Sequence, residues 1–397
     1  MDHLSARHNN ITEPQTLAMA RISRELQAKG IDVISLSIGE PDFDTPDFIK
    51  EAAKKAVDDN FSHYTPVSGY LDLREAICKK FKRDNGLDYK PDQIVVSTGA
   101  KQSIANVILA LIDKDDEVVI PTPYWVSYSE QMKMADGKVV FIPSTVESKF
   151  KITPEQLKSA INNKTKLMIF STPCNPSGAV YTKEELQSFA EVIAAHPNMF
   201  VISDEIYEHI NFIGKHESLA QFNKIKDQVI TVNGVSKGFA MTGWRIGYIG
   251  APAFIAKACE KIQGQFTSGT SSIAQRAAMA AVLADPNVTD EMRNAFLKRR
   301  DLVVNGLKEM PGVRVYVPDG AFYVFPDISS YFGKSTGNIS IHNSYDLTMY
   351  LLNEANVALV SGDAFGDDNC IRFSFATSEE KLTEALNRVK LALQRLK

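Results

Sequence analysis

The chain of 397 residues is too long for one hydrophobic core of ordinary size, so its globular composition, 44% hydrophobic and 23% charged, predicts two domains. A formal net charge of −4 and an isoelectric point near 6.0 argue against a basic surface for nucleic acid or an anionic membrane. No run reaches the ~18 consecutive apolar residues of a membrane helix, and we find no apolar signal segment. The four cysteines are scattered without metal-ligand spacing, so we expect reduced thiols, no metal site and a cytoplasmic location.

The N-terminal part contains a helical pattern over residues 16–30, closed by Gly30. From about residue 93 to 252, short apolar runs alternate with helical patterns such as 103–112 and 182–196. Nearly continuous Val, Ile and Phe are typical of strands buried on both faces of a mainly parallel sheet. There are seven such runs, at 93–99, 117–121, 138–143, 166–173, 200–207, 228–234 and 245–250. This alternation predicts an α/β domain with a mainly parallel seven-stranded sheet sandwiched by helices.

The C-terminal part has a different pattern, which predicts a smaller α+β domain. A charged amphipathic helix is expected over 287–310, then a β-rich segment, a polar insertion near 333–344, a helix over 345–355 and a final strand over 370–376. We expect the N-terminal segment to cross back and join this unit. The predicted parts are an N-terminal arm with a segment of the small domain, the large domain, and the small C-terminal domain, covering 1–45, 46–285 and 286–397.

Polar side chains follow three neighbouring predicted strands, where ligands bind in open α/β sheets. Asn175 follows one strand, Asp204 and Tyr207 end the next, and Lys237 follows the third, with Arg245 eight residues later. Taken singly, each has an ordinary explanation as a turn residue, a helix cap or a solvated cation. Together they suit a phosphorylated pyridine aldehyde: lysine forms an imine, the acid keeps the ring nitrogen protonated, amide and phenol bond the ring oxygen, and arginine pairs with phosphate.

A fourth strand end predicts an anion cradle. Residues 97–101 pass from a strand into a helix, and free amides at a helix start bind anions. Many α/β proteins have this feature, so it is weak alone. The chain lacks GxGxxG and GxxxxGK[ST], which argues against a dinucleotide or P-loop site.

The chain closely resembles the fold-type I, class I aminotransferases that use pyridoxal 5'-phosphate, over essentially its whole length. The resemblance is carried by GEPDFDTP (39–46), YTPVSG (64–69), NPSG (175–178), SDEIYEH (203–209) and SKGFAMTGWRIGY (236–248). AKQS (100–103), PYWVSY (123–128), FTSGTSSIAQ (266–275) and GDAFGDD (362–368) are similar to the bacterial and plastid branch of aspartate aminotransferases, some of which also aminate prephenate.

This resemblance implies catalytic and ring-binding roles. Lys237 would form the Schiff base with the cofactor and then act as general base and acid, with a pKa lowered toward neutrality by burial and neighbouring positive charge. Asp204 would keep the pyridine nitrogen protonated. Asn175 and Tyr207 would bond the ring oxygen, and Trp125 would stack on the ring face.

The resemblance also implies the phosphate contacts and a homodimer with shared active sites. Ser236, Arg245 and the amides of Ala100 and Lys101 would hold the phosphate, and Tyr64 would reach it from the partner subunit. Tyr64 and the loop at 266–272 have no evident role within their own subunit, which favours the dimer.

The amino acid and 2-oxo acid substrates would meet two cations. Arg372 would clamp the α-carboxylate through a planar two-bond fork that lysine cannot reproduce, together with the backbone at Gly39 and the side chains of Trp125 and Asn175. Lys101 is the candidate for the distal carboxylate.

The N-terminal helix departs from the pattern of this branch, which usually begins Lys-Pro-Ser-x-Thr. Here the lysine is Glu13, and the serine and threonine are Gln15 and Leu17. An acid at Glu13 should repel the second carboxylate of a large diacid such as prephenate. We therefore favour an aspartate aminotransferase, which converts L-aspartate and 2-oxoglutarate to oxaloacetate and L-glutamate.

Three alternatives stay open. Two keep the cofactor: a glutamate/aspartate-prephenate aminotransferase, and an aromatic- or alanine-type aminotransferase. The third is a non-enzymatic ligand sensor, which is disfavoured because a DNA-binding module does not fit in the first 30 residues and because Lys237, Asp204 and Arg372 are all present.

Overall fold

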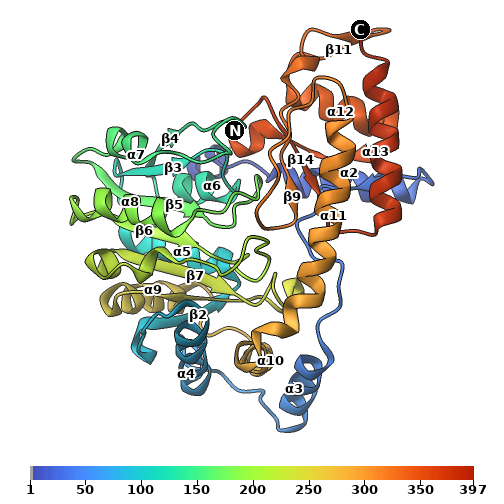
Figure 1. The fold of residues 1–397 in the computed structure, drawn as a ribbon. Helices are drawn as coiled ribbons and strands as arrows, with labels where there is room; N and C mark the ends of the chain where they lie inside the picture. The colour runs from blue at the N-terminus through green and yellow to red at the C-terminus, as the bar shows by residue number, and fades with distance from the viewer. Residues whose placement is uncertain (1–2) are drawn as a thin grey trace.

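The computed structural model describes residues 3–397, so the first two residues of the predicted arm lie outside it. A large sheet covered by helices lies beside a smaller unit of helices and short strands (Figure 1). In the large sheet the strand order is β2-β8-β7-β6-β5-β3-β4. The strands are β2 (Ile94–Thr98), β3 (Glu117–Pro121), β4 (Lys138–Ile142), β5 (Thr165–Ser171), β6 (Phe200–Asp204), β7 (Val229–Gly234) and β8 (Ile246–Gly250). All seven predicted strands are confirmed, and only β8 runs antiparallel to its neighbours, β2 and β7.

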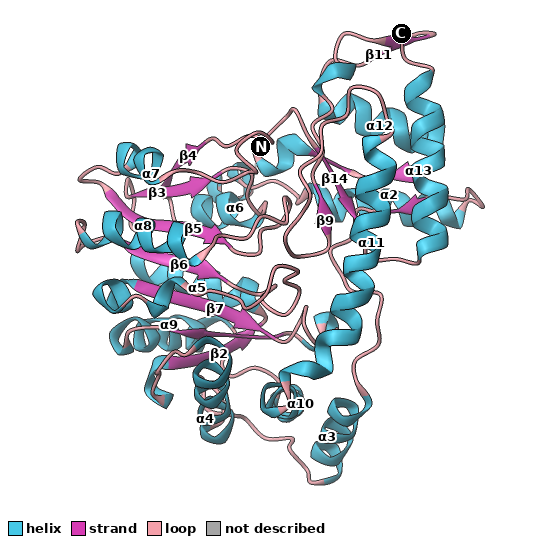
Figure 2. Ribbon diagram, viewed as in Figure 1, coloured by secondary structure: helices cyan, strands magenta, loops and turns pink. Residues whose placement is uncertain are grey.

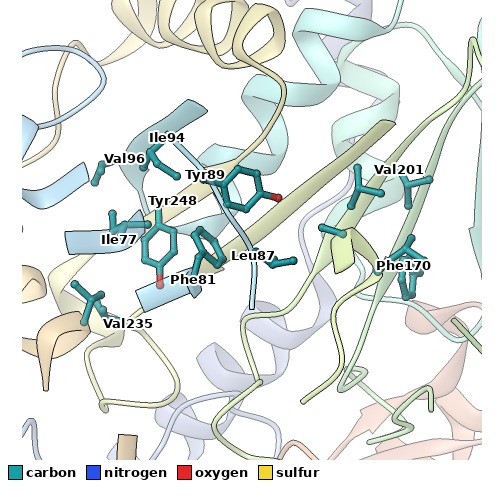
Figure 3. Close-up of a cluster of buried hydrophobic side chains, with 14 of the residues drawn as sticks. Ile77, Phe81, Leu87, Tyr89, Ile94, Val96, Phe170, Val201, Val235 and Tyr248 are labelled. Atoms are coloured by element: carbon teal, nitrogen blue, oxygen red, sulfur yellow. The ribbon is translucent and has the colours of Figure 1, made fainter. Parts of the chain in front are cut away.

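Two buried apolar clusters cover the two faces of this sheet, as the continuous Val and Ile runs predict. In β6, for example, Val201 belongs to one cluster and Ile202 to the other. Figure 3 shows part of the first cluster, in which the Phe81 ring lies 5.6 Å from the Tyr248 ring. That face is covered by α3 (Asp47–Asp58), α4 (Leu71–Lys80), α7 (Pro154–Ala160), α8 (Lys183–Ala194) and α10 (Ser272–Leu283). The other face is covered by α5 (Ala100–Leu111), α6 (Ser127–Met134) and α9 (Ala253–Phe266).

The smaller unit has its own apolar cluster. Its strands β9 (Tyr323–Val324), β13 (Val360–Ser361) and β14 (Ile371–Ser374) form an antiparallel sheet in the order β13-β14-β9. Around them lie α2 (Gln15–Ala28), α11 (Asp290–Lys308), α12 (Ser344–Ala355) and α13 (Glu379–Gln394) (Figure 1). The polar insertion forms the hairpin of β10 (Ser335–Thr336) and β11 (Ile339–Ser340), and α1 (Ala6–Asn10) precedes α2.

The N-terminal segment reaches this smaller unit, where β1 (Ile34–Ser35) pairs in parallel with β12 (Val357–Ala358). The domain limits given above stay a prediction. Helix α13 was not predicted, although its sequence carries helical signals: Ser378 caps it, and Leu382, Leu386, Val389 and Leu393 are buried along one face. No helix within residues 3–397 has the length and apolarity needed to cross a bilayer.

Candidate active site

One cavity of about 350 Å³ lies where the carboxyl ends of β5, β6 and β7 face the smaller unit. Figure 2 shows the arrows of β5, β6 and β7 pointing toward β9 and β14. Eleven of the twelve predicted site residues line this cavity: Gly39, Ala100, Lys101, Trp125, Asn175, Asp204, Tyr207, Ser236, Lys237, Arg245 and Arg372. The twelfth, Tyr64, does not line it. The strand ends therefore bring together side chains that lie far apart in the sequence, as the doubly wound topology requires.

Lys237 follows β7 and reaches across the cavity to the N-terminal segment. Its Nζ donates a hydrogen bond of 2.5 Å to the carbonyl oxygen of Gly39. Burial lowers the pKa of this ammonium from 10.5 to about 8, Glu40 opposes that effect, and the cations Arg245 and Arg372 add to it. The amine can therefore gain and lose a proton close to neutral pH, which agrees with the sequence-based expectation.

Asp204 ends β6 and is almost completely buried, with 4% of its surface exposed. Its Oδ2 accepts a hydrogen bond of 2.7 Å from the Tyr128 hydroxyl, and its Oδ1 accepts one of 3.2 Å from the Ile206 amide. Burial raises the pKa of the carboxyl group to about 6, against the effect of these two donors. Sequence reasoning missed Tyr128, although it lies three residues after Trp125 at the start of a helix, a spacing that places two side chains together.

Arg372 on β14 is 1% exposed and is held by neutral partners. Its Nη1 donates to Asn175 Oδ1 at 2.9 Å, and its Nη2 donates to the Ser37 carbonyl oxygen at 2.6 Å. No acidic side chain in the described part of the chain forms an ion pair with it, and its Nε has no hydrogen-bond partner there. A buried cation without a counter-ion is costly, so an anion from a ligand would stabilise it.

Tyr207 and Asn175 share the wall beside Arg372. The hydroxyl groups of Tyr207 and Tyr323 are 2.8 Å apart and hydrogen-bonded, and the guanidinium of Arg372 lies 4.5 Å from the centre of the Tyr323 ring. Because Asn175 Oδ1 is engaged by Arg372, the Nδ2 group of this amide remains to donate to a ligand. Sequence reasoning missed Tyr323 and Ser37, and no local motif marks either of them.

The predicted anion cradle lies at the start of α5. The amides of Ala100 and Lys101 open this helix, and first-turn amides have no acceptor inside their own helix. Arg245 has a left-handed backbone with φ 58° and donates to the Thr242 carbonyl oxygen at 2.8 Å. Gly99 leaves space for the guanidinium, since a Cβ at this position would collide with it. A strained arginine beside free amides is a geometry that suits phosphate.

Lys101 lies on the cavity wall beside Trp125, with its Nζ 5.1 Å from the centre of the indole ring. The side chain has solvent access, yet the surrounding protein still lowers its pKa, mainly by desolvation and then through the positive charge of Arg245. The cavity therefore carries a second cation besides Arg372.

The N-terminal departure lies mostly outside the cavity, and the expected effect of Glu13 on a substrate stays a prediction. The Glu13 carboxylate is exposed and lies 3.6 Å from the guanidinium of Arg21, and the residue does not line the cavity. Gln15 is bound by Ser361 of the smaller unit, whose hydroxyl donates to its Oε1 at 2.7 Å. Leu17 does line the cavity. The geometry therefore gives no support to repulsion of a substrate carboxylate by Glu13.

Tyr64 is 99% exposed, and Phe266, at the start of the predicted interface loop, is 68% exposed. These exposed rings agree with the expectation that they act in a partner's site, which stays a prediction.

No group of His, Cys, Asp and Glu within residues 3–397 could hold a metal ion.

The fold and the cavity define a class of protein, and comparison with known families identifies it. Residues 31–389 match the family described as aminotransferase class I and II, so the chain belongs to that family, whose members use pyridoxal 5'-phosphate. This agrees with the fold-type I resemblance noted in the sequence.

Similar proteins come from plants and bacteria. The chain is 47% identical to the bifunctional aspartate aminotransferase and glutamate/aspartate-prephenate aminotransferase of Petunia hybrida, over 99% of this chain and 83% of that protein. It is 42% identical to the aspartate aminotransferase of Rhizobium meliloti, whose crystal structure superposes with a TM-score of 0.96 over the whole of both chains. The chain is 38% identical in sequence to the aspartate aminotransferase of Thermus thermophilus. The structure of that protein with maleate superposes with a TM-score of 0.93 over 99% of this chain and all of that one.

Proposed function

We propose that this protein is an aspartate aminotransferase that uses pyridoxal 5'-phosphate to interconvert L-aspartate and 2-oxoglutarate with oxaloacetate and L-glutamate. The observation that carries the proposal is one cavity in which the amine of Lys237, with a pKa of about 8, lies with the buried, unpaired guanidinium of Arg372 and the ammonium of Lys101. A lysine that titrates near neutrality suits imine chemistry, and two cations suit a dicarboxylic acid.

The residues of the cavity fit this cofactor. Asp204 offers a buried carboxylate for a protonated ring nitrogen, and Tyr207 and Asn175 offer donors for the ring oxygen. The α5 amides, Ser236 and Arg245 offer donors for the phosphate. When bound, the cofactor supplies an aldehyde for covalent attachment and an electron sink for the substrate carbanion.

Two residues of the chain handle protons in this scheme. Lys237 removes the proton from the substrate Cα and returns it, and a pKa near 8 makes the free amine available at working pH. Asp204, with a pKa of about 6, is mostly ionised at neutral pH and keeps a proton on the ring nitrogen. Lys237 is partly buried and Asp204 is almost completely buried, and the lower local dielectric strengthens these charge interactions.

The two cations bind the substrate carboxylates. Arg372 binds the α-carboxylate, oriented by its hydrogen bonds to Asn175 and Ser37. Lys101 binds the distal carboxylate. The names of the relatives support this assignment, since they are aspartate aminotransferases and one was crystallised with the dicarboxylate maleate.

Prephenate is the second candidate substrate. The Petunia relative carries both activities in its name, and in this chain Leu17 gives the cavity an apolar wall while Glu13 lies outside it. An apolar wall suits the ring of prephenate, which alanine and aspartate lack.

A homodimer with shared sites completes the proposal. Tyr64, exposed in its own subunit, would reach the phosphate of the partner's site. Dilution below the dimer dissociation constant should then release cofactor and activity together, and a fully active monomer would contradict shared sites.

The test is the half-reaction of the purified, cofactor-loaded protein with single amino donors, followed by the change in cofactor absorbance. Aspartate and glutamate should convert the cofactor faster than alanine and phenylalanine. Prephenate and 2-oxoglutarate are then compared as acceptors in the return half-reaction. Faster conversion by alanine or phenylalanine would overturn the dicarboxylic assignment, and a Lys237→Ala variant that transaminates normally would overturn the mechanism.

A further inference from the structure

Asp204 accepts a hydrogen bond from a residue that has no part in the cofactor contacts proposed above. The donor is the hydroxyl of Tyr128, 2.7 Å from Oδ2, and both side chains are buried. Tyr128 is 1% exposed and lines the same cavity. Among the residues that the structure describes, this is the one hydroxyl group that donates to the Asp204 carboxylate.

Tyr128 also connects Asp204 to the proposed ring-stacking residue. The edge of its ring lies against the Trp125 indole, with centroids 5.5 Å apart and planes at 90°. Its amide donates to the Trp125 carbonyl oxygen at 3.0 Å in the turn that opens α6. One side chain therefore contacts both the acid proposed for the ring nitrogen and the aromatic group proposed for the ring face.

We propose that Tyr128 is a positioning residue, which holds the Asp204 carboxylate ionised and oriented toward the ring nitrogen of the bound cofactor. The inference rests on the proposed function, because it assigns Asp204 to that nitrogen. It concerns this chain's own hydrogen bond and can be tested in protein that carries no cofactor.

The direction of the effect follows from the groups around Asp204. Burial and the neighbouring Glu205 favour the neutral acid, while the Tyr128 and Ile206 donors and the Lys237 cation favour the carboxylate. Tyr128 stays a neutral donor over the working range, since burial and the adjacent carboxylate raise its pKa well above 10. A donor to a carboxylate stabilises the charged form, so its loss moves Asp204 toward protonation at neutral pH.

The hydroxyl also helps to fix the orientation of the carboxylate, since each of its two oxygens accepts one hydrogen bond. With Oδ2 engaged by Tyr128, the carboxylate cannot rotate without breaking that bond, and Oδ1 is turned toward the Ile206 amide. A fixed carboxylate gives a directed contact to a ring nitrogen, as preorganised sites require.

The test is Tyr128→Phe, which deletes the hydroxyl and keeps the ring that packs on Trp125. In cofactor-free protein, the infrared carbonyl band of protonated Asp204, assigned by its absence in Asp204→Asn, is followed against pH. We expect its midpoint to rise by at least one pH unit, a tenfold change in the acidity constant, as expected for a lost hydrogen bond to a charged group. In loaded enzyme, the acid limb of the kcat profile with aspartate should move in the same direction, with little change in KM.

Tyr181→Phe is the matched control, because Tyr181 is also buried and its hydroxyl bonds a backbone amide outside the cavity. It should lose similar stability and keep the parent's Asp204 midpoint. If Tyr128→Phe folds only with the cofactor bound, the acid limb of the kcat profile decides in place of the infrared titration. An unmoved midpoint in the Tyr128 variant overturns the proposal, whatever its stability. If the parent protein does not transaminate aspartate, the proposed function fails while the infrared titration still decides the role of Tyr128.

Discussion

Replacing Lys237 by Met should stabilise the cofactor-free protein in a pH-dependent way. Lowering the pKa of Lys237 from 10.5 to about 8 means that the fold disfavours the charged amine. Each pH unit of that difference corresponds to ~1.4 kcal/mol, so the penalty is at most about 3 kcal/mol. Below pH 8 the ammonium is charged in both the folded and unfolded chain, and the full penalty applies. Between pH 8 and 10.5 the unfolded chain binds more protons, so the parent gains stability as pH rises.

The assay is urea unfolding of the parent and of Lys237→Met, both without cofactor, from pH 6.5 to 10. The variant should be more stable below pH 8, and its advantage should shrink by up to about 1.4 kcal/mol per pH unit above that. The different packing of methionine changes the stability by an amount that does not depend on pH. The test therefore uses the slope of the stability difference against pH. Lys237→Ala should show a different offset and the same slope. A stability difference that stays constant across this range would refute a strongly lowered lysine pKa.

Three further substitutions test other parts of the site and its frame. Arg372→Lys should lower kcat/KM for aspartate roughly ten- to hundredfold, which corresponds to the loss of about one charge-assisted hydrogen bond. An unchanged kcat/KM would argue against a two-bond clamp. Lys101→Met should lower kcat/KM for aspartate by about tenfold and leave alanine nearly unaffected, in steady-state assays with both donors; equal losses would remove Lys101 from the distal carboxylate. Lys80→Met should reduce the free energy of unfolding by roughly 3–5 kcal/mol, because it leaves the buried Glu208 carboxylate without the lysine of its ion pair. Thermal denaturation measures this loss, and an unchanged stability of the variant would contradict the prediction.

Local pattern was sufficient for the sheet and for the strand-end residues. Most of the runs of Val, Ile and Phe are buried on both faces, with the edge strand β4 as the exception, so the runs predict strands without knowledge of their partners. Asn175 and Lys237 follow β5 and β7, and Asp204 ends β6, which lies between those two strands in the sheet. Their order along the chain therefore already placed them at one edge. The helical spacing of the apolar residues in α13 would also have predicted this helix, although we did not predict it.

The residues contributed by distant segments required the tertiary structure or a family resemblance. The contact of Arg372 with Asn175 spans 197 residues, and that of Lys237 with Gly39 spans 198. The position of Glu13 illustrates the difference: its charge suggested repulsion of a substrate, and the fold turns it toward Arg21.

The sequence by itself determined the buried strands, their helical covers and the amine, acid and amide at the strand ends, because these depend on local hydrophobic period and on chain order. Only the tertiary structure decided the environment of those groups. The pKa of Lys237, the hydrogen bond from Tyr128 to Asp204 and the unpaired charge of Arg372 depend on which distant atoms exclude water around them. Burial is a property of the packed chain, and its effect on a charge cannot be read from the residues beside it.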